Sequence, residues 1–390
     1  MRNRSVRAVA LAVTGVLVAG CGTVVDGTPI PDSSAPALAL DTGGLSTEPR
    51  TVTASAAQRR VLAANRLAER LLLPTDVDPR FTRAGDLSVR AVVQASNLKD
   101  PLGDADAQRV GRRGIVYGFV SERWAPGDGV EEGVLMLGIR MADDAAARGA
   151  VDDFRAEGGA TEVVDGRTDW AVRREAPVAG RKRIVFTAYA AAGPTLIIAI
   201  PWAIDETTSR ARVAKALQMQ IAKLQDYSGP GLAELDGLAP DQDSIVSHTV
   251  TPEPIESGTF RSYDGFRGRA AQLHWESNPA TSASLFDEVG VDLVGTGRNV
   301  VYRARDAAGA TRLAAGLAAS WQRQQRARRL VIDGLADAQC WTYHQSALTD
   351  VDDTSCAVPV GRYVSTFSSR QATLARQVTS AGYLLLRKAP

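Results

Sequence analysis

The sequence predicts an α+β protein made of two tandem modules related by duplication, each an antiparallel sheet with helices packed on one face. Three observations lead to this class. The ordered part of the chain, about 335 residues, is too long for one ordinary hydrophobic core. Strand-like segments alternate with amphipathic helical segments in both halves. One helical segment of the first half also aligns with one of the second, with Ala147 and Phe154 matching Ala310 and Leu317.

The first module should begin with a helix at Ser55, because Ser55 and Gln58 have the spacing of a capping box. Apolar residues recur on one helical face up to Leu71, and Pro74 should end the helix. After the aligned helix, the apolar pattern predicts further strands and a closing helix. A strand at 134–139 precedes the aligned helix. The strands that follow it are 169–172, 184–189 and 195–200, and the closing helix is 208–224.

The segment 184–204 is almost uncharged and long enough to span a membrane. Gly193 and Pro194 divide it in the middle, and β-branched residues dominate its second part. This combination predicts a β-hairpin with one strand buried on both faces.

The second module repeats the order of the first. Its expected strands are 299–302, 338–344 and 356–366, and its last helix opens near Ser368. Asn278 and Pro279 should start an additional short helix that Gly290 ends.

The chain starts with a basic and then apolar segment, which is typical of a secretory leader. As a helix, the apolar run 8–19 would be about 18 Å long, too short for a bilayer core of roughly 30 Å. Val18 to Cys21 resemble a bacterial lipobox, which implies cleavage between Gly20 and Cys21 and attachment of diacylglycerol and a further fatty acyl chain to Cys21. The alternative is an ordinary signal peptide with an incidental cysteine.

These features divide the chain into four parts. Residues 1–20 are the lipoprotein signal peptide, and residues 21–54, rich in Gly, Pro, Ser and Thr, are a lipidated flexible tether. The modules are 55–230 and 231–390, separated in a stretch rich in Gly, Pro and Asp. Two or more lipid chains would hold the protein stably on the extracytoplasmic face of the cell membrane.

Cys340 and Cys356 are the remaining cysteines. Outside the cytoplasm such a pair is expected to form a disulfide. A zinc site is the alternative, although neither a CxxC nor an HxxxH pattern accompanies the pair. The formal net charge of +1 becomes slightly negative without the leader, so charge gives no reason to expect nucleic acid as a partner.

No GxSxG, Walker A or HExxH motif occurs, so the sequence predicts no catalytic residue, cofactor or metal site. The densest basic cluster follows a helix and consists of Arg323, Arg326, Arg328 and Arg329. Arginine holds carboxylates and phosphates well, which makes the cluster a candidate ligand contact. The alternative is a set of cations that interact with the dipole at the helix C-terminus.

His344 is a further candidate contact, because strand alternation places it on the same face as Cys340. Ser346, Asp350, Asp352 and Asp353 lie nearby, so the sequence allows a Ser-His-Asp arrangement, with an edge-strand histidine beside a polar loop as the alternative. The preferred function is non-catalytic binding or scaffolding of an envelope lipid, glycan or protein. An envelope hydrolase that uses His344 with a nearby hydroxyl, or a purely structural component of an envelope complex, are the other two readings.

Several stretches resemble an uncharacterised actinobacterial lipoprotein family with tandem N- and C-terminal domains of unknown function, found in bacteria with mycolic-acid envelopes. Besides the lipobox and the two late cysteines, the matching stretches are 40–43, 73–74, 77–79, 286–293, 301–306 and 360–363. The resemblance covers nearly all of the mature chain. It implies two domains and a cell-envelope location, and it supplies no activity or ligand.

Overall fold

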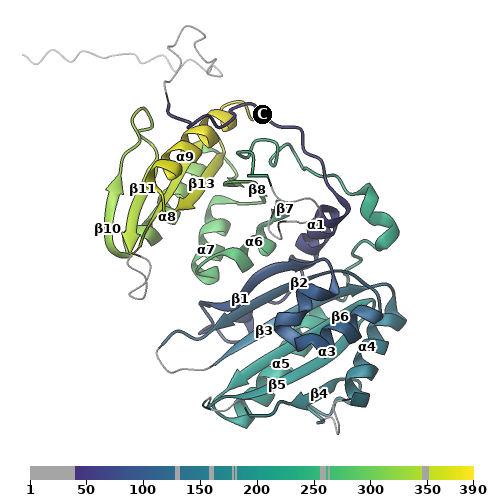
Figure 1. Ribbon diagram of the computed structural model, residues 1–390. Coiled ribbons are helices and arrows are strands. Elements are labelled where there is room, and N and C mark those ends of the chain that lie inside the picture. Colours follow the sequence, from purple (N-terminus) through teal and green to yellow (C-terminus); the bar gives the residue numbers. More distant parts are fainter. Residues whose placement is uncertain are drawn as a thin grey trace, which may run out of the picture. The chain divides into compact units, whose positions relative to one another are not determined.

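The structure is a computed structural model that describes residues 40–127, 132–157, 162–177, 180, 182–254, 261, 264–344 and 351–390. Within these ranges the chain forms two consecutive modules, each built on one antiparallel sheet with helices (Figure 1). The predicted α+β class and its tandem arrangement are therefore confirmed.

The first module contains a six-stranded sheet in the order β1-β2-β3-β6-β5-β4. Its described strands are β1 (Arg83–Val92), β2 (Ile115–Trp124), β3 (Gly133–Met141), β4 (Ala171–Arg174), β5 (Ile184–Ala192) and β6 (Thr195–Ala203). Its described helices are α1 (Ala56–Ala68), α2 (Pro74–Val77), α3 (Lys99–Arg112), α4 (Asp144–Glu157) and α5 (Glu206–Lys223), with 3-10 turns at Ala95–Leu98 and Leu232–Gly237.

The apolar segment 184–204 forms the hairpin of β5 and β6, as predicted, and Gly193 takes the positive φ that the turn requires. In the parts of the chain that the structure describes, no helix is long and apolar enough to cross a membrane. The first helix ends at Ala68, before Pro74, and Pro74 instead opens the short helix α2. The expectation that Pro74 ends the first helix is thus wrong, because proline fits the first turn of a helix.

The second module contains a seven-stranded sheet in the order β10-β11-β12-β13-β9-β8-β7. Its described strands are β7 (Gly265–Gly268), β8 (Leu293–Thr296), β9 (Val300–Arg303), β10 (Gln325–Leu330), β11 (Gln339–His344), β12 (Asp352–Val360) and β13 (Tyr363–Ser369). Its described helices are α6 (Arg269–Trp275), α7 (Pro279–Val289), α8 (Ala307–Gln322) and α9 (Ala372–Leu386). Asn278 caps α7 and Gly290 ends it in the left-handed conformation, as predicted.

The two sheets share one topology. Read from β7, the second sheet runs β7-β8-β9-β13-β12-β11, which matches β1-β2-β3-β6-β5-β4 strand for strand. A helix follows the third strand in each module (α4 and α8), and another follows the strand beside it (α5 and α9). Strand β10 is an addition at the edge of the second sheet. This agreement supports the duplication that the sequence repeat predicts.

Helices cover both faces of each sheet, which corrects the expectation of helices on one face. In β3, Val134 and Met136 pack with α1 and α5, whereas Leu135 and Leu137 pack with α3 and α4. In the second module α8 and α9 lie on opposite faces of β12. The central strands are apolar on both sides, and a two-sided apolar strand is stable only when both faces are covered.

Residues 40–54 form a strap that packs on the second module, so the predicted flexible tether does not extend to residue 54. Leu40 and Leu45 pack beside α9, and Asp41 accepts hydrogen bonds from Gln377. The backbone amide of Arg50 donates to the carbonyl of Ser247 at 3.1 Å. The strap therefore ties the start of the first module to the end of the second. Residues 21–39 lie outside the described ranges.

Helix α1 and strand β2 join the modules through buried polar contacts. His274 of α6 is 1% exposed; its Nδ1 lies 2.9 Å from Ser121 Oγ and its Nε2 3.2 Å from the carbonyl oxygen of Ala68. Burial lowers the pKa of His274 to about 3, and nearby Lys223 adds to the effect, so the ring is neutral at physiological pH. A neutral ring donates from Nε2 to the carbonyl and accepts at Nδ1 from the serine, which satisfies both nitrogens.

Candidate ligand pocket in the C-terminal module

A pocket with a volume of about 490 Å³ lies in the second module between the sheet and helices α6, α7 and α8. Strands β8, β9 and β13 line it through Thr296, Val300, Tyr302 and Thr366. Trp275 of α6 and Leu285 of α7 contribute apolar surface, and α8 contributes more. The volume lies within the range of roughly 300–1,000 Å³ that is usual for small-molecule sites.

One wall of the pocket is a hydrogen-bonded cluster around Glu276, the residue that ends α6. Its Oε1 accepts hydrogen bonds from Gln272 Nε2 at 2.7 Å and from the Tyr302 hydroxyl at 2.9 Å. Its Oε2 accepts one from Ser282 Oγ at 3.1 Å. All four residues are buried. Both oxygens of the carboxylate are thus occupied by groups from α6, α7 and β9.

Arg267 of β7 balances the charge of Glu276 in the same cluster. The guanidinium is buried, donates from Nε to Gln272 Oε1 at 2.7 Å and from Nη2 to Thr296 Oγ1 at 2.8 Å, and lies 4.9 Å from the centre of the Trp275 ring. Burial lowers the pKa of Arg267 to about 10, so it is still charged at neutral pH. Burial and the adjacent Glu276 raise the pKa of Tyr302 well above its usual value, which keeps its hydroxyl a donor.

The mouth of the pocket carries exposed polar groups and one cation. Thr281 of α7 and Ser320 of α8 are exposed, while the Trp321 ring is half-buried. Arg323, the residue that caps the C-terminus of α8, also lines the pocket and is exposed. Among the described residues, no acidic side chain forms an ion pair with Arg323.

Of the four arginines predicted as ligand contacts, only Arg323 lines this pocket. Arg326, Arg328 and Arg329 belong to the edge strand β10, so they are not cations at a helix end as the alternative proposed. Arg328 forms an ion pair with Asp352 at 2.5 Å. A charged edge strand discourages pairing with other chains, which gives these arginines a structural reason to be present.

His344 lies on β11, which is an inner strand between β10 and β12, so the reading of an edge-strand histidine is wrong. Its Nδ1 is 3.5 Å from Asp352 Oδ1, and the residue is 8% exposed. Asp352, one of the acids named from the sequence, therefore lies beside His344, whereas Ser346 and Asp350 lie outside the described residues. The hydrolase arrangement around His344 is therefore still a prediction from the sequence.

Cys340 and Cys356 form a disulfide between the paired strands β11 and β12, as the sequence predicts. Both residues are buried under α9. Gly20 and Cys21, the expected cleavage and lipidation site, lie outside the described residues. The described residues contain no group of three or more His, Cys, Asp or Glu side chains arranged to hold a metal ion.

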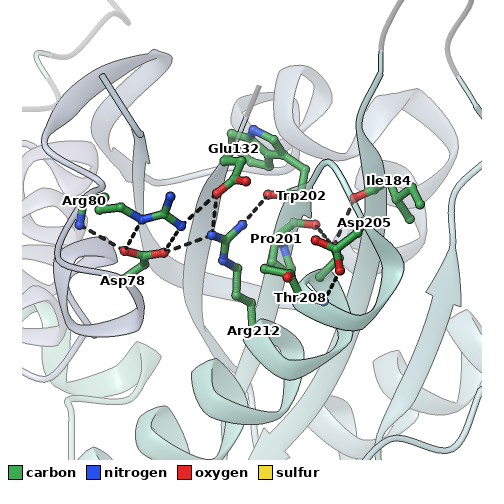
Figure 2. A network of polar contacts seen from close by, with 10 residues as sticks. Asp78, Arg80, Glu132, Ile184, Pro201, Trp202, Asp205, Thr208 and Arg212 are labelled. Atoms are coloured by element: carbon green, nitrogen blue, oxygen red, sulfur yellow. Dashed lines mark hydrogen bonds and ion pairs between the residues drawn. The ribbon is translucent and has the colours of Figure 1, made fainter. Parts of the chain in front are cut away.

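A second cluster of buried charges lies in the first module and is shown in Figure 2. Arg212 of α5 is 5% exposed and contacts Asp78 Oδ2 at 2.9 Å and Glu132 Oε2 at 2.7 Å, while Arg80 contacts the same two oxygens at 2.7 and 2.9 Å. Burial alone would raise the pKa of Asp78, but hydrogen bonds from Arg80 and Arg212 outweigh burial and lower it to about 2. Each carboxylate faces two arginines, so this cluster holds α2, β3 and α5 together.

No sequence motif marks the residues of the pocket wall. Gln272 and Glu276 are four residues apart and share a helical face, while Arg267 places a charge inside β7 and Tyr302 a hydroxyl inside β9. Charged residues inside strand patterns are the signal that could have indicated a buried polar cluster. The pattern alone does not show which of them meet.

The fold and the pocket define a two-module α+β protein with a small-molecule-sized pocket in its second module. Two family models match the chain: "Domain of unknown function (DUF7373) N-terminal" over residues 50–239, and "Domain of unknown function (DUF7373) C-terminal" over residues 244–389. The chain belongs to this family, and the tandem organisation implied by the resemblance is confirmed.

No curated protein matches the chain in sequence. Among solved structures, the extracellular domain of PknH from Mycobacterium tuberculosis is similar, with 14% identity and a TM-score of 0.27. The match covers 48% of this chain and 99% of the PknH domain. This likeness is too weak to assign a function.

Proposed function

We propose that this protein is an envelope lipoprotein, anchored through Cys21 on the extracytoplasmic face of the cell membrane, that binds a small ligand in the pocket of its second module. The leader and the lipobox support this location. The disulfide between Cys340 and Cys356 supports it too, because disulfides persist in oxidising compartments outside the cytoplasm. The partner would come from the envelope, as a lipid, a glycan or part of a protein.

The observation that carries the binding function is the wall around Glu276. Both oxygens of its carboxylate accept hydrogen bonds from the protein, so the wall is held in place before a ligand enters. A site that is already ordered loses less conformational entropy on binding. Because both carboxylate oxygens accept hydrogen bonds from the protein, Glu276 is a structural group of the wall rather than a general acid or base.

The anchor is tested with Cys21→Ser. Wild-type protein should sediment with membranes and incorporate an alkyne-labelled palmitate, whereas Cys21→Ser should be unlabelled and leave the membrane fraction. A Thr23→Ser variant, which leaves the cysteine in place, is the matched control. A Cys21→Ser protein that is still labelled and membrane-bound would refute the anchor.

The pocket is tested by mass spectrometry of small molecules that co-purify with protein from its native envelope. Ser320→Trp places a large side chain at the mouth, and Gln322→Trp places the same side chain on the opposite side of α8. A molecule that accompanies wild type and Gln322→Trp but not Ser320→Trp is the expected result. If both variants carry the same molecules as wild type, the pocket is not the binding site.

A further inference from the structure

The geometry points to a glycan as the ligand of this pocket: a sugar ring or short oligosaccharide that bears a carboxylate or phosphate group. This inference rests on the proposed function and adds the chemical class. It follows from the distribution of apolar, hydroxyl and charged groups around the pocket.

The pocket combines apolar surface with hydroxyl groups; those of Ser320 and Thr366 donate to the backbone carbonyls of Leu317 and Val300 and can still accept a hydrogen bond from a ligand. Trp321 and Leu317 of α8 offer apolar surface at the mouth, and Trp275 offers it beside the buried wall. Thr281, Ser320 and Thr366 bring hydroxyl groups to the same space. A sugar ring has an apolar face of C–H groups and a rim of hydroxyls, so it matches aromatic rings and serine or threonine side chains together.

The same lining disfavours a simple alkyl chain. The wall opposite the mouth contains the charged pair Arg267 and Glu276, and the sheet side contains the Tyr302 and Thr296 hydroxyls. An alkyl chain laid here would remove water from polar groups without returning a hydrogen bond, which costs free energy. A ligand rich in hydroxyls replaces the water instead.

Arg323 accounts for the anionic group. The charges of Arg267 and Glu276 are balanced inside the wall, so Arg323 is the cation at the mouth without an acidic partner among the described residues. A guanidinium binds a carboxylate or phosphate through paired hydrogen bonds. An acidic substituent on the sugar would therefore lie at the mouth, with the ring inside.

The full mature chain is screened against an array of defined oligosaccharides, some neutral and some bearing a carboxylate or phosphate. The dissociation constants of those that bind are then measured by calorimetry, and sodium myristate is the lipid probe. Acidic glycans should bind best. Trp321→Ala should weaken binding about tenfold, because the ring is an aromatic contact for the sugar, while Trp321→Phe keeps most of the affinity. Arg323→Ala should reduce the affinity for acidic glycans to that for neutral ones, and Ser320→Trp, but not Gln322→Trp, should abolish both.

The outcomes separate the two proposals. If no arrayed glycan binds with a Kd below about 1 mM but myristate binds and Ser320→Trp blocks it, the glycan class is wrong and the pocket function stands. Glycan binding that Ser320→Trp leaves unchanged would move the site away from this pocket and overturn the inference. If neither probe class binds and native protein carries nothing in the pocket, both proposals fail.

Discussion

Replacing Arg212 by methionine should destabilise the first module strongly. Arg212 is 5% exposed, contacts Asp78 and Glu132, and donates from Nη1 to the carbonyl of Trp202 at 3.0 Å. Methionine keeps much of the side-chain volume, so little packing is lost. The main effect is electrostatic, because Glu132, which is 7% exposed, loses one of its two cationic partners. The effect therefore combines the lost charge with the lost hydrogen bond to the carbonyl of Trp202.

The magnitude follows from what stays behind. Removing one partner of a buried ion pair costs roughly 3–5 kcal/mol, because the other charge is left buried. Arg80 still contacts both carboxylates, which places Arg212→Met at the lower end, about 3 kcal/mol. The Arg80 side chain is 57% exposed, so Arg80→Met should cost about 1 kcal/mol or less.

The assay is urea unfolding at pH 7, followed by circular dichroism and tryptophan fluorescence, since urea leaves ionic interactions unscreened. Adding Glu132→Gln to Arg212→Met should recover part of the loss, because no unpaired charge then remains at that position. The reasoning is refuted if Arg212→Met costs no more than Arg80→Met. It is also refuted if the double variant is no more stable than Arg212→Met alone.

Three further predictions concern stability. The pKa of Asp78 is about 2 in the folded chain against 3.8 for an unperturbed group. The carboxylate therefore contributes to the free energy of unfolding above pH 3.8, and this contribution is lost as the pH falls through 2. The urea midpoint of Asp78→Asn should depend less on pH across this window than that of wild type. Reducing the disulfide of Cys340 and Cys356, 16 residues apart, should lower the free energy of unfolding by about 3 kcal/mol in the chain-entropy account; an unchanged urea midpoint in dithiothreitol would contradict this. Leu45→Asp should cost about 1–2 kcal/mol and speed hydrogen exchange along the strap, whereas normal exchange there would mean that Leu45 does not hold it.

Local sequence patterns predicted several elements correctly. The hairpin at 184–204 and the helix bounded by Asn278 and Gly290 depend on neighbouring residues alone, and the structure has both. The pairing of Cys340 with Cys356 followed because no other partner was left. In each case the physical cause, a turn, a cap or a cross-link between two available thiols, is contained in a short stretch or a simple count.

Other elements were not predictable in this way. Strand β10 consists mainly of arginine and glutamine, so it lacks the apolar alternation of a strand and exists because β11 offers it a hydrogen-bonding edge. Residues 40–54 have the composition of a tether, yet α9 and its neighbours supply an apolar surface on which Leu40 and Leu45 pack. Tertiary contacts outweigh local propensity at both places.

The candidate site shows the same division. Arg323 was a candidate from the sequence because of its basic neighbours, but those neighbours are on β10 and only Arg323 reaches the pocket. Trp275 and Glu276 had no motif to mark them. They became part of a site because α6 ends where α7 begins and β9 passes beneath them.

By itself, the sequence determined the class of fold, the repeat and the disulfide, because each is encoded by periodicity or by residues counted along the chain. Only the tertiary structure decided that helices cover both sheet faces and that a polar wall surrounds one pocket. The wall requires Arg267, Gln272, Glu276, Ser282 and Tyr302 to meet with hydrogen-bonding geometry. They come from two strands and two helices. The packing of those elements links the five side chains through hydrogen bonds of 2.7 to 3.1 Å, and the order of the elements along the chain does not reveal these bonds.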